Sequence, residues 1–135
     1  MPSDPRESYV AKASPQFQTA FEGVRKRVKA RFPTAQPAFQ YDMPGWTVPI
    51  PQERQPPAQG TLPPDHMYIL FAARKQGPTL HVWNPLDDGA LKKNRKDLEA
   101  AGFKVMVGCL QFNRKAEYPV QAVDKLFAAM AASLK

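Results

Sequence analysis

A chain of 135 residues is the usual size of one domain, and it is long enough to bury a hydrophobic core without disulfide staples. Its single cysteine, Cys109, excludes an intramolecular disulfide and fits a reducing compartment. The formal net charge of +7 at pH 7 is compatible with polyanion binding, but without a motif it is better explained by a basic surface that maintains solubility.

The sequence shows neither a membrane span nor a targeting segment. No apolar run approaches the roughly 18 residues that a membrane-spanning helix needs. The first residues lack the basic and apolar regions of a signal peptide. We therefore expect residues 1–135 to form one cytoplasmic domain with no membrane association.

The first strong helix signal is Ser14-Pro15, because a hydroxyl can cap the helix and proline suits its first position. Apolar side chains then recur at steps of three and four as far as Val28. Pro33 disfavours helical geometry in the residue before it, so the helix should end near Phe32. A shorter helix capped by Asp4 is expected to precede it.

Two short strands are expected next, on either side of Pro44-Gly45. Apolar and polar residues alternate up to Met43, and the alternation restarts at Trp46. Pro44-Gly45 suits a type II turn, since proline presets φ at the second position and glycine accepts a positive φ at the third. Pro49 has no N–H to donate, which favours a short second strand or one at a sheet edge.

Residues 51–66 contain five prolines and one leucine, a composition that predicts a loop. An insertion, a functional flap and a partner-binding polyproline segment are all compatible with it. The runs Met67–Ala73 and Thr79–Trp83 then predict an antiparallel hairpin in the centre of the sheet.

The C-terminal half predicts a helix, a strand and a last helix. The middle helix should cover about residues 87–101, with Asp87 and Asp88 at its N-terminus. A strand over residues 103–112 should bend at Gly108, and Pro119 should open the last helix. The fold class is therefore α+β, a mostly antiparallel sheet of about four to six strands backed by N-terminal, middle and C-terminal helices.

Few residues suggest chemistry. The chain contains no Gly-rich phosphate loop, no HExxH and no paired CxxC, and it has only two histidines. His81 in mid-strand and Cys109 in an apolar strand fit structural roles better than catalytic ones. We expect no catalytic residue, metal site or cofactor, and the common enzyme classes are disfavoured.

Several segments occur in the order seen in the YdhG-like family, which the chain resembles from about residue 7 to its end, outside the proline-rich segment. They are Tyr9 ahead of the Ser14-Pro15 helix, Tyr41-Asp42-Met43-Pro44, Met67–Ala73, and Gly108-Cys109-Leu110-Gln111-Phe112 before the Pro119 helix. The resemblance implies a frataxin-related α+β sandwich, and at least one member of the family is regarded as an iron chaperone. Frataxin-like iron binding uses an acidic ridge, since iron prefers carboxylate oxygen. Here the first long helix is basic, so no metal ligands are transferred.

Three functions stay open. The leading one is a non-enzymatic YdhG-like accessory protein that binds a small ligand or a partner in a cleft beside the central hairpin. Its candidate residues combine apolar surface with a polar group: Tyr41, Trp46, Tyr68, His81 and Trp83. The same residues could instead belong mainly to the core.

The second function is polyanion, nucleic-acid or acidic-partner binding through two basic clusters. Its candidate residues are Arg25, Lys26, Lys29, Lys92, Lys93 and Lys96. The third is the iron-chaperone function, which the resemblance alone implies and the basic helix disfavours. A homodimer through an exposed sheet edge is a further hypothesis.

Overall fold

The computed structural model describes residues 5–55, 65–75, 77–84, 90–106, 108–112 and 118–134. Within these ranges the elements are, in chain order, α1 (Pro5–Ala11), α2 (Pro15–Arg31), β1 (Gln36–Gln40), β2 (Met43–Pro49), the 3-10 helix η1 (Gln52–Arg54), β3 (His66–Arg74), β4 (Gly77–Trp83), α3 (Ala90–Lys93), α4 (Arg95–Ala100), β5 (Phe103–Met106), β6 (Cys109–Phe112) and α5 (Val120–Ala132). None of the described helices is both long and apolar enough to cross a lipid bilayer.

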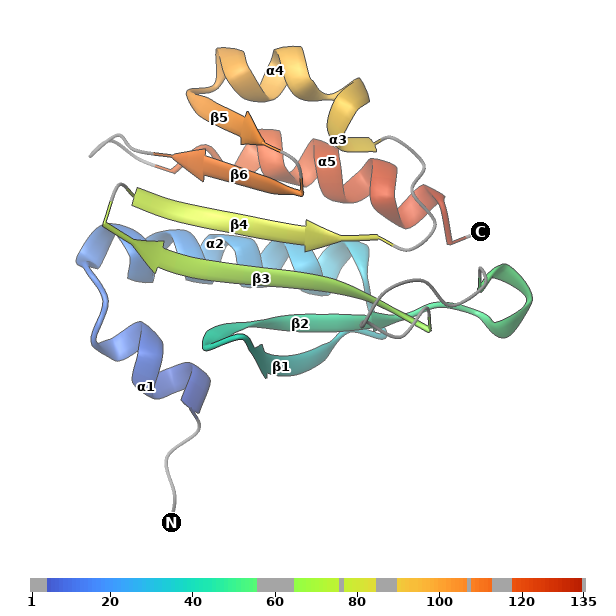
Figure 1. The fold of residues 1–135 in the computed structure, drawn as a ribbon, viewed down its shortest axis with the longest axis horizontal. Helices are drawn as coiled ribbons and strands as arrows, with labels where there is room; N and C mark the ends of the chain where they lie inside the picture. The colour runs from blue at the N-terminus through green and yellow to red at the C-terminus, as the bar shows by residue number, and fades with distance from the viewer. Residues whose placement is uncertain are drawn as a thin grey trace.

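The strands form one six-stranded sheet in the order β1-β2-β3-β4-β6-β5, and every neighbouring pair is antiparallel. Figure 1 shows α2 and α5 behind the sheet and α3 and α4 beyond its β5 edge. The α+β fold with a mostly antiparallel sheet backed by helices is thereby confirmed.

Helix α2 forms where the start and stop signals predict it. The Ser14 side chain accepts a hydrogen bond from the Phe17 backbone N–H at 3.2 Å, and Pro15 occupies the first turn. The helix ends at Arg31, and Phe32 follows as its C-cap. Its buried stripe faces the sheet and consists of Phe17, Ala20, Phe21, Val24 and Val28.

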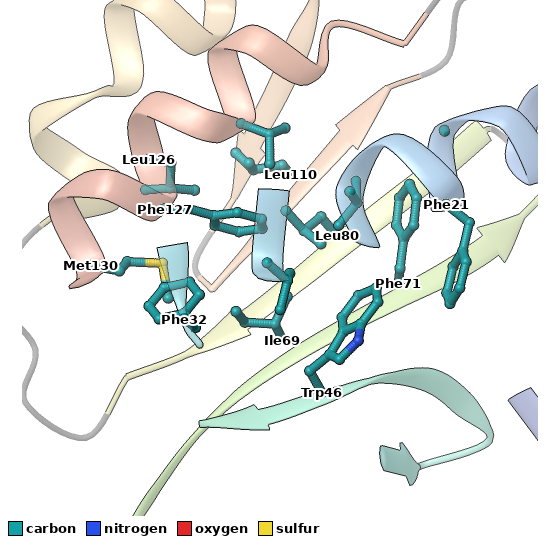
Figure 2. Close-up of a cluster of buried hydrophobic side chains, with 14 of the residues drawn as sticks. Phe21, Phe32, Trp46, Ile69, Phe71, Leu80, Leu110, Leu126, Phe127 and Met130 are labelled. Atoms are coloured by element: carbon teal, nitrogen blue, oxygen red, sulfur yellow. The ribbon is translucent and has the colours of Figure 1, made fainter. Parts of the chain in front are cut away.

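The main core fills the space between the helices and one face of the sheet. Phe71, Leu80 and Leu110 point into it from neighbouring strands and are fully buried. Phe21 and Phe127 meet them from α2 and α5 (Figure 2). Burying large apolar side chains in this way is the main stabilising term of the fold.

The predicted Pro44-Gly45 turn is wrong, because the first hairpin turns at Tyr41 and Asp42. These two residues have φ angles of 53° and 59°, and Gln40 pairs with Met43 across them. Two central residues with positive φ make a type I′ turn, whose twist matches that of the strands. Pro44 and Gly45 lie inside β2 instead.

Gly45 has a packing role in β2. It pairs with Leu70 of β3, and a Cβ at this position would collide with the Ile69 carbonyl oxygen. β2 is also an interior strand rather than an edge strand, since it pairs with both β1 and β3. Pro49 is tolerated because it is the last residue of the strand.

The predicted middle helix is divided in two. Asn94 separates α3 from α4, and its side-chain amide donates to the Ala90 carbonyl at 2.8 Å. Asp87 and Asp88, expected at the helix start, lie outside the described residues.

The predicted 103–112 strand is likewise two strands, β5 and β6, which pair as an antiparallel hairpin. Gly108 lies in their turn with a φ of 74°, so it reverses the chain rather than bending one strand.

The proline-rich segment is partly described. Residues 52–54 form η1, and residues 56–64 lie outside the described ranges. His66, assigned to the loop by its sequence, is the first residue of β3 and pairs with Pro49.

Helices α2 and α5 are joined by a close approach and an ion pair. A Cβ on Gly23 would lie 2.7 Å from a Val120 methyl carbon, so the helices approach where glycine has no side chain. Further along, the Arg31 guanidinium donates two hydrogen bonds to the Asp124 carboxylate, at 3.0 and 2.8 Å. This bidentate geometry fixes the orientation of the two helices.

Candidate functional site

The face of the sheet opposite α2 and α5 carries most of the candidate ligand-binding residues. Residues paired across neighbouring antiparallel strands lie on the same face, so the register defines its membership. We call it the open face. Its residues are Gln36, Ala38 and Gln40 of β1, Met43, Gly45, Thr47 and Pro49 of β2, His66, Tyr68, Leu70, Ala72 and Arg74 of β3, Gly77, Thr79, His81 and Trp83 of β4, Cys109 and Gln111 of β6, and Lys104 and Met106 of β5.

Tyr68, His81 and Trp83 lie together on this face. Tyr68 pairs directly with Trp83, and their ring centroids are 5.7 Å apart with the planes at 52°. His81 is two residues before Trp83 in β4 and pairs with Leu70. All three candidate side chains are half-buried, so one edge of each is accessible to a ligand.

Trp46 does not belong to this group. It lies on the helix side of the sheet, is only 5% exposed, and stacks on Phe21 with centroids 5.2 Å apart. The Arg6 guanidinium lies 5.4 Å from its ring centroid. Trp46 is therefore a core residue, which is the alternative that the sequence left open.

Tyr41 lies at the β1–β2 turn and is 62% exposed. Burial raises the pKa of Tyr68, and the nearby Asp65 and Tyr41 raise it further. The Tyr68 hydroxyl is therefore protonated at neutral pH and can donate a hydrogen bond.

His81 is neutral at pH 7. Burial lowers the pKa of its imidazole below the usual value, and the positive charge of Arg74 lowers it further. Its Nε2 atom is shielded from solvent and has no hydrogen-bond partner among the described residues. Burial also raises the pKa of the Cys109 thiol. Cys109 of β6 is the residue opposite His81 of β4 in the strand register.

Sequence reasoning did not identify the apolar patch beside these residues. Met43, Leu70 and Ala72 form a small buried cluster separate from the main core. The Arg74 side chain extends over it, with Nη2 3.6 Å from the Met43 sulfur. The apolar run Met67–Ala73 does not show which of its residues lie on this face, and the register that adds Met43 depends on the position of the first turn.

The basic candidates divide into two separate groups. Arg25 pairs with Glu22 at 3.3 Å and lies 5.0 Å from the Phe21 ring centroid, so it also packs against the core. The remaining five are exposed, and none forms a salt bridge with another described residue: Lys26 and Lys29 on α2, Lys92 and Lys93 on α3, and Lys96 on α4. Helix α5 contacts α2 on one side and α3 and α4 on the other (Figure 1), so it separates the two groups.

Within the described ranges, no three side chains drawn from His, Cys, Asp and Glu gather as they would around a metal ion. On the open face, the structure brings together the sequence-predicted Tyr68, His81 and Trp83. No protein-family model, curated protein or solved structure matches this chain.

Proposed function

We propose that this protein is a non-enzymatic YdhG-like accessory domain that binds a small ligand on the open face of its sheet. The observation that carries the proposal is the contact of Tyr68 with Trp83 beside His81, on the face opposite the packing helices. Half-buried aromatic rings with polar groups are typical of sites that hold a planar molecule. The family assignment itself rests on the ordered sequence segments alone.

The chemistry of these side chains defines the ligand class. Tyr68 offers a hydroxyl donor, and the neutral His81 offers one donor and one acceptor nitrogen. Trp83 adds an aromatic surface next to both. We therefore expect a small aromatic molecule that carries a hydrogen-bond acceptor, such as a carboxylate or a carbonyl group.

The two tryptophans make the test simple, because they lie on opposite faces of the sheet. A set of small aromatic acids and amides would be titrated into the full chain while tryptophan fluorescence is recorded. We expect some members to quench the fluorescence saturably. The quenching should disappear in Trp83→Phe, because the one tryptophan left in this variant, Trp46, is buried in the core.

Tyr68→Ala should weaken binding of the same compounds, whereas Lys104→Ala, an exposed residue at the β5 edge of the same face, should not. Loss of one stacking aromatic is expected to cost about 1 kcal/mol, or roughly fivefold in Kd. Binding that survives in both Trp83→Phe and Tyr68→Ala would place the ligand elsewhere.

A second function, polyanion binding, is favoured by the five exposed lysines that have no salt bridge to a described residue. When lysine side chains contact phosphates, they displace the counterions bound to the polyanion, so the affinity falls steeply as the salt concentration rises. Retention on a heparin column should then depend on ionic strength and fall in Lys26→Gln/Lys29→Gln or in Lys92→Gln/Lys93→Gln. The pair whose substitution reduces retention identifies the binding surface, because α5 lies between α2 and α3.

Arg25→Gln provides the contrast. Arg25 already contacts Glu22 and the Phe21 ring. Its substitution should therefore lower the free energy of unfolding, and it should reduce retention on heparin less than the lysine substitutions do. Elution of the wild-type protein in the void volume at low salt would remove the polyanion proposal.

A further inference from the structure

Three metal-binding side chains form a row across the open face. The register pairs His81 of β4 with Cys109 of β6, and Cys109 with Met106 of β5. The three residues therefore lie on one face of three consecutive strands, with the cysteine in the middle. They are 28 residues apart at most along the chain; the β5–β6 pairing joins Met106 to Cys109, and the β4–β6 pairing adds His81.

The strand geometry makes the first pair a close one. The Val82 N–H donates to the Gly108 carbonyl at 2.9 Å, so Val82 and Gly108 form a hydrogen-bonded pair. The adjacent pair of His81 and Cys109 is then of the non-hydrogen-bonded kind, in which side chains approach most closely. Cβ atoms of such a pair are about 4.5 to 5.5 Å apart, a separation that one ion can bridge.

These side chains are available for a ligand. Each of the three residues is half-buried rather than enclosed in the core. The His81 Nε2 atom has no hydrogen-bond partner among the described residues and is shielded from water. A buried nitrogen without a partner costs free energy, which coordination to an ion would recover.

The ligand types select the ion. Thiolate and thioether sulfur are soft ligands that favour monovalent copper, whereas hard cations need carboxylate or carbonyl oxygen. The open-face residues of β3 to β6 include no carboxylate; besides the row, they are His66, Tyr68, Leu70, Ala72, Arg74, Gly77, Thr79, Trp83, Lys104 and Gln111. His66 lies at the far end of β3, where it pairs with Pro49 of β2, and is not part of the row.

We propose that His81, Cys109 and Met106 bind one Cu(I) ion through an imidazole nitrogen, a thiolate sulfur and a thioether sulfur. As the sulfur–copper bond forms, the Cys109 thiol releases its proton to solvent, and the oxidation state of copper does not change. This site goes beyond the aromatic ligand site proposed above and shares only His81 with it.

The test is an anaerobic titration of the full chain with Cu(I) against a coloured Cu(I) chelator, which reports the free ion. We expect one ion per chain in the wild-type protein and loss of this binding in Cys109→Ser. Met106→Leu and His81→Gln should each weaken it by at least the roughly 10- to 100-fold that loss of an outer partner costs a metal site. Met43→Leu, an open-face methionine on β2 outside the row, should bind like the wild type.

Two results would overturn the proposal. If Met106→Leu and His81→Gln both retain wild-type affinity, the ion is held by a lone thiol and not by the row. If Cys109→Ser retains it, the ion binds elsewhere. Thermal melting of each variant verifies the fold, and Trp83→Phe, which tests the aromatic ligand site, should leave copper affinity unchanged.

Discussion

At the scale of single residues, a buried hydroxyl and a strained turn each cost stability. The Tyr118 ring packs against Phe71, Phe103 and Phe112 with centroids 5.3 to 5.4 Å away. Its hydroxyl is buried without a hydrogen-bond partner among the described residues, and burial raises its pKa, so it is protonated. The ring stabilises the core while its oxygen opposes this effect.

Removing that oxygen should stabilise the protein. A buried unpaired polar group costs about 1 to 3 kcal/mol, so Tyr118→Phe should raise the free energy of unfolding by about 1 kcal/mol. Urea unfolding followed by circular dichroism measures the change. A lower free energy of unfolding would show that the hydroxyl is hydrogen-bonded in solution.

The β1–β2 turn gives a second prediction. Asp42 has a φ of 59°, a region that glycine adopts without steric cost. Asp42→Gly matches the preferred second residue of a type I′ turn and should raise the free energy of unfolding by about 0.5 to 1 kcal/mol.

Gly108→Ala is the matched reverse case for the turn prediction. Its φ of 74° is also positive, and a Cβ there would have room, with its nearest contact at 3.5 Å. The variant should therefore lose about 1 kcal/mol for conformational reasons alone. Equal effects of the two substitutions on thermal melting would contradict the assigned turn.

At the scale of elements, a close approach decides how α2 and α5 pack. Glycine in a helix interior costs about 1 kcal/mol relative to alanine. Gly23 is tolerated because a Cβ would lie 2.7 Å from a Val120 methyl carbon. Valine is stiff about χ1 and cannot easily turn this methyl group away.

Gly23→Ala should therefore destabilise the wild-type protein despite its better helix propensity. In a Val120→Ala background the contact is gone, and the same substitution should stabilise by about 1 kcal/mol. A double-mutant cycle in urea measures this reversal of sign. Additive effects would mean that the two helices do not approach at Gly23.

At the scale of the whole molecule, the Arg31–Asp124 pair links stability to pH. The hydrogen bonds from Arg31 lower the pKa of the Asp124 carboxyl, burial opposes this, and the charges of Arg31 and Arg27 lower it further. The pair joins residues 93 positions apart in the chain, so it exists only in the folded state.

The sign of the pH effect follows from the lowered pKa. A carboxyl whose pKa falls on folding stabilises the native state above its unfolded pKa of about 3.9, and the contribution is lost as pH falls through the folded value. The melting temperature of Asp124→Asn should therefore lie below that of the wild type at pH 6 and converge with it toward pH 2.

Asp97→Asn is the control for that pH series. Its carboxylate is 64% exposed and lies 3.5 Å from Lys125, and exposed pairs contribute little. We expect a small difference from the wild type at every pH. A constant deficit of Asp124→Asn across the series would mean that shape, not charge, explains its effect.

Most helices and strands could be predicted from local sequence patterns, because caps, turns and periodicity act over a few residues. The Ser14 cap and the apolar stripe define α2, and the alternation from Thr79 to Trp83 separates Leu80 from His81 onto opposite faces. Tyr68, His81 and Trp83 are among the cleft candidates because of their side-chain type, but side-chain type does not show that they share a face with Cys109.

The pairings between distant segments could not be predicted in this way. A turn at Pro44-Gly45 agreed with the sequence, but the chain turns earlier, at Tyr41 and Asp42. Gly45 is needed instead for the close pairing of β2 with β3. The β4–β6 pairing likewise aligns His81 with Cys109 and Met106, and burial on the helix side removes Trp46 from the site. Such outcomes depend on register and packing between distant strands, which local periodicity does not encode.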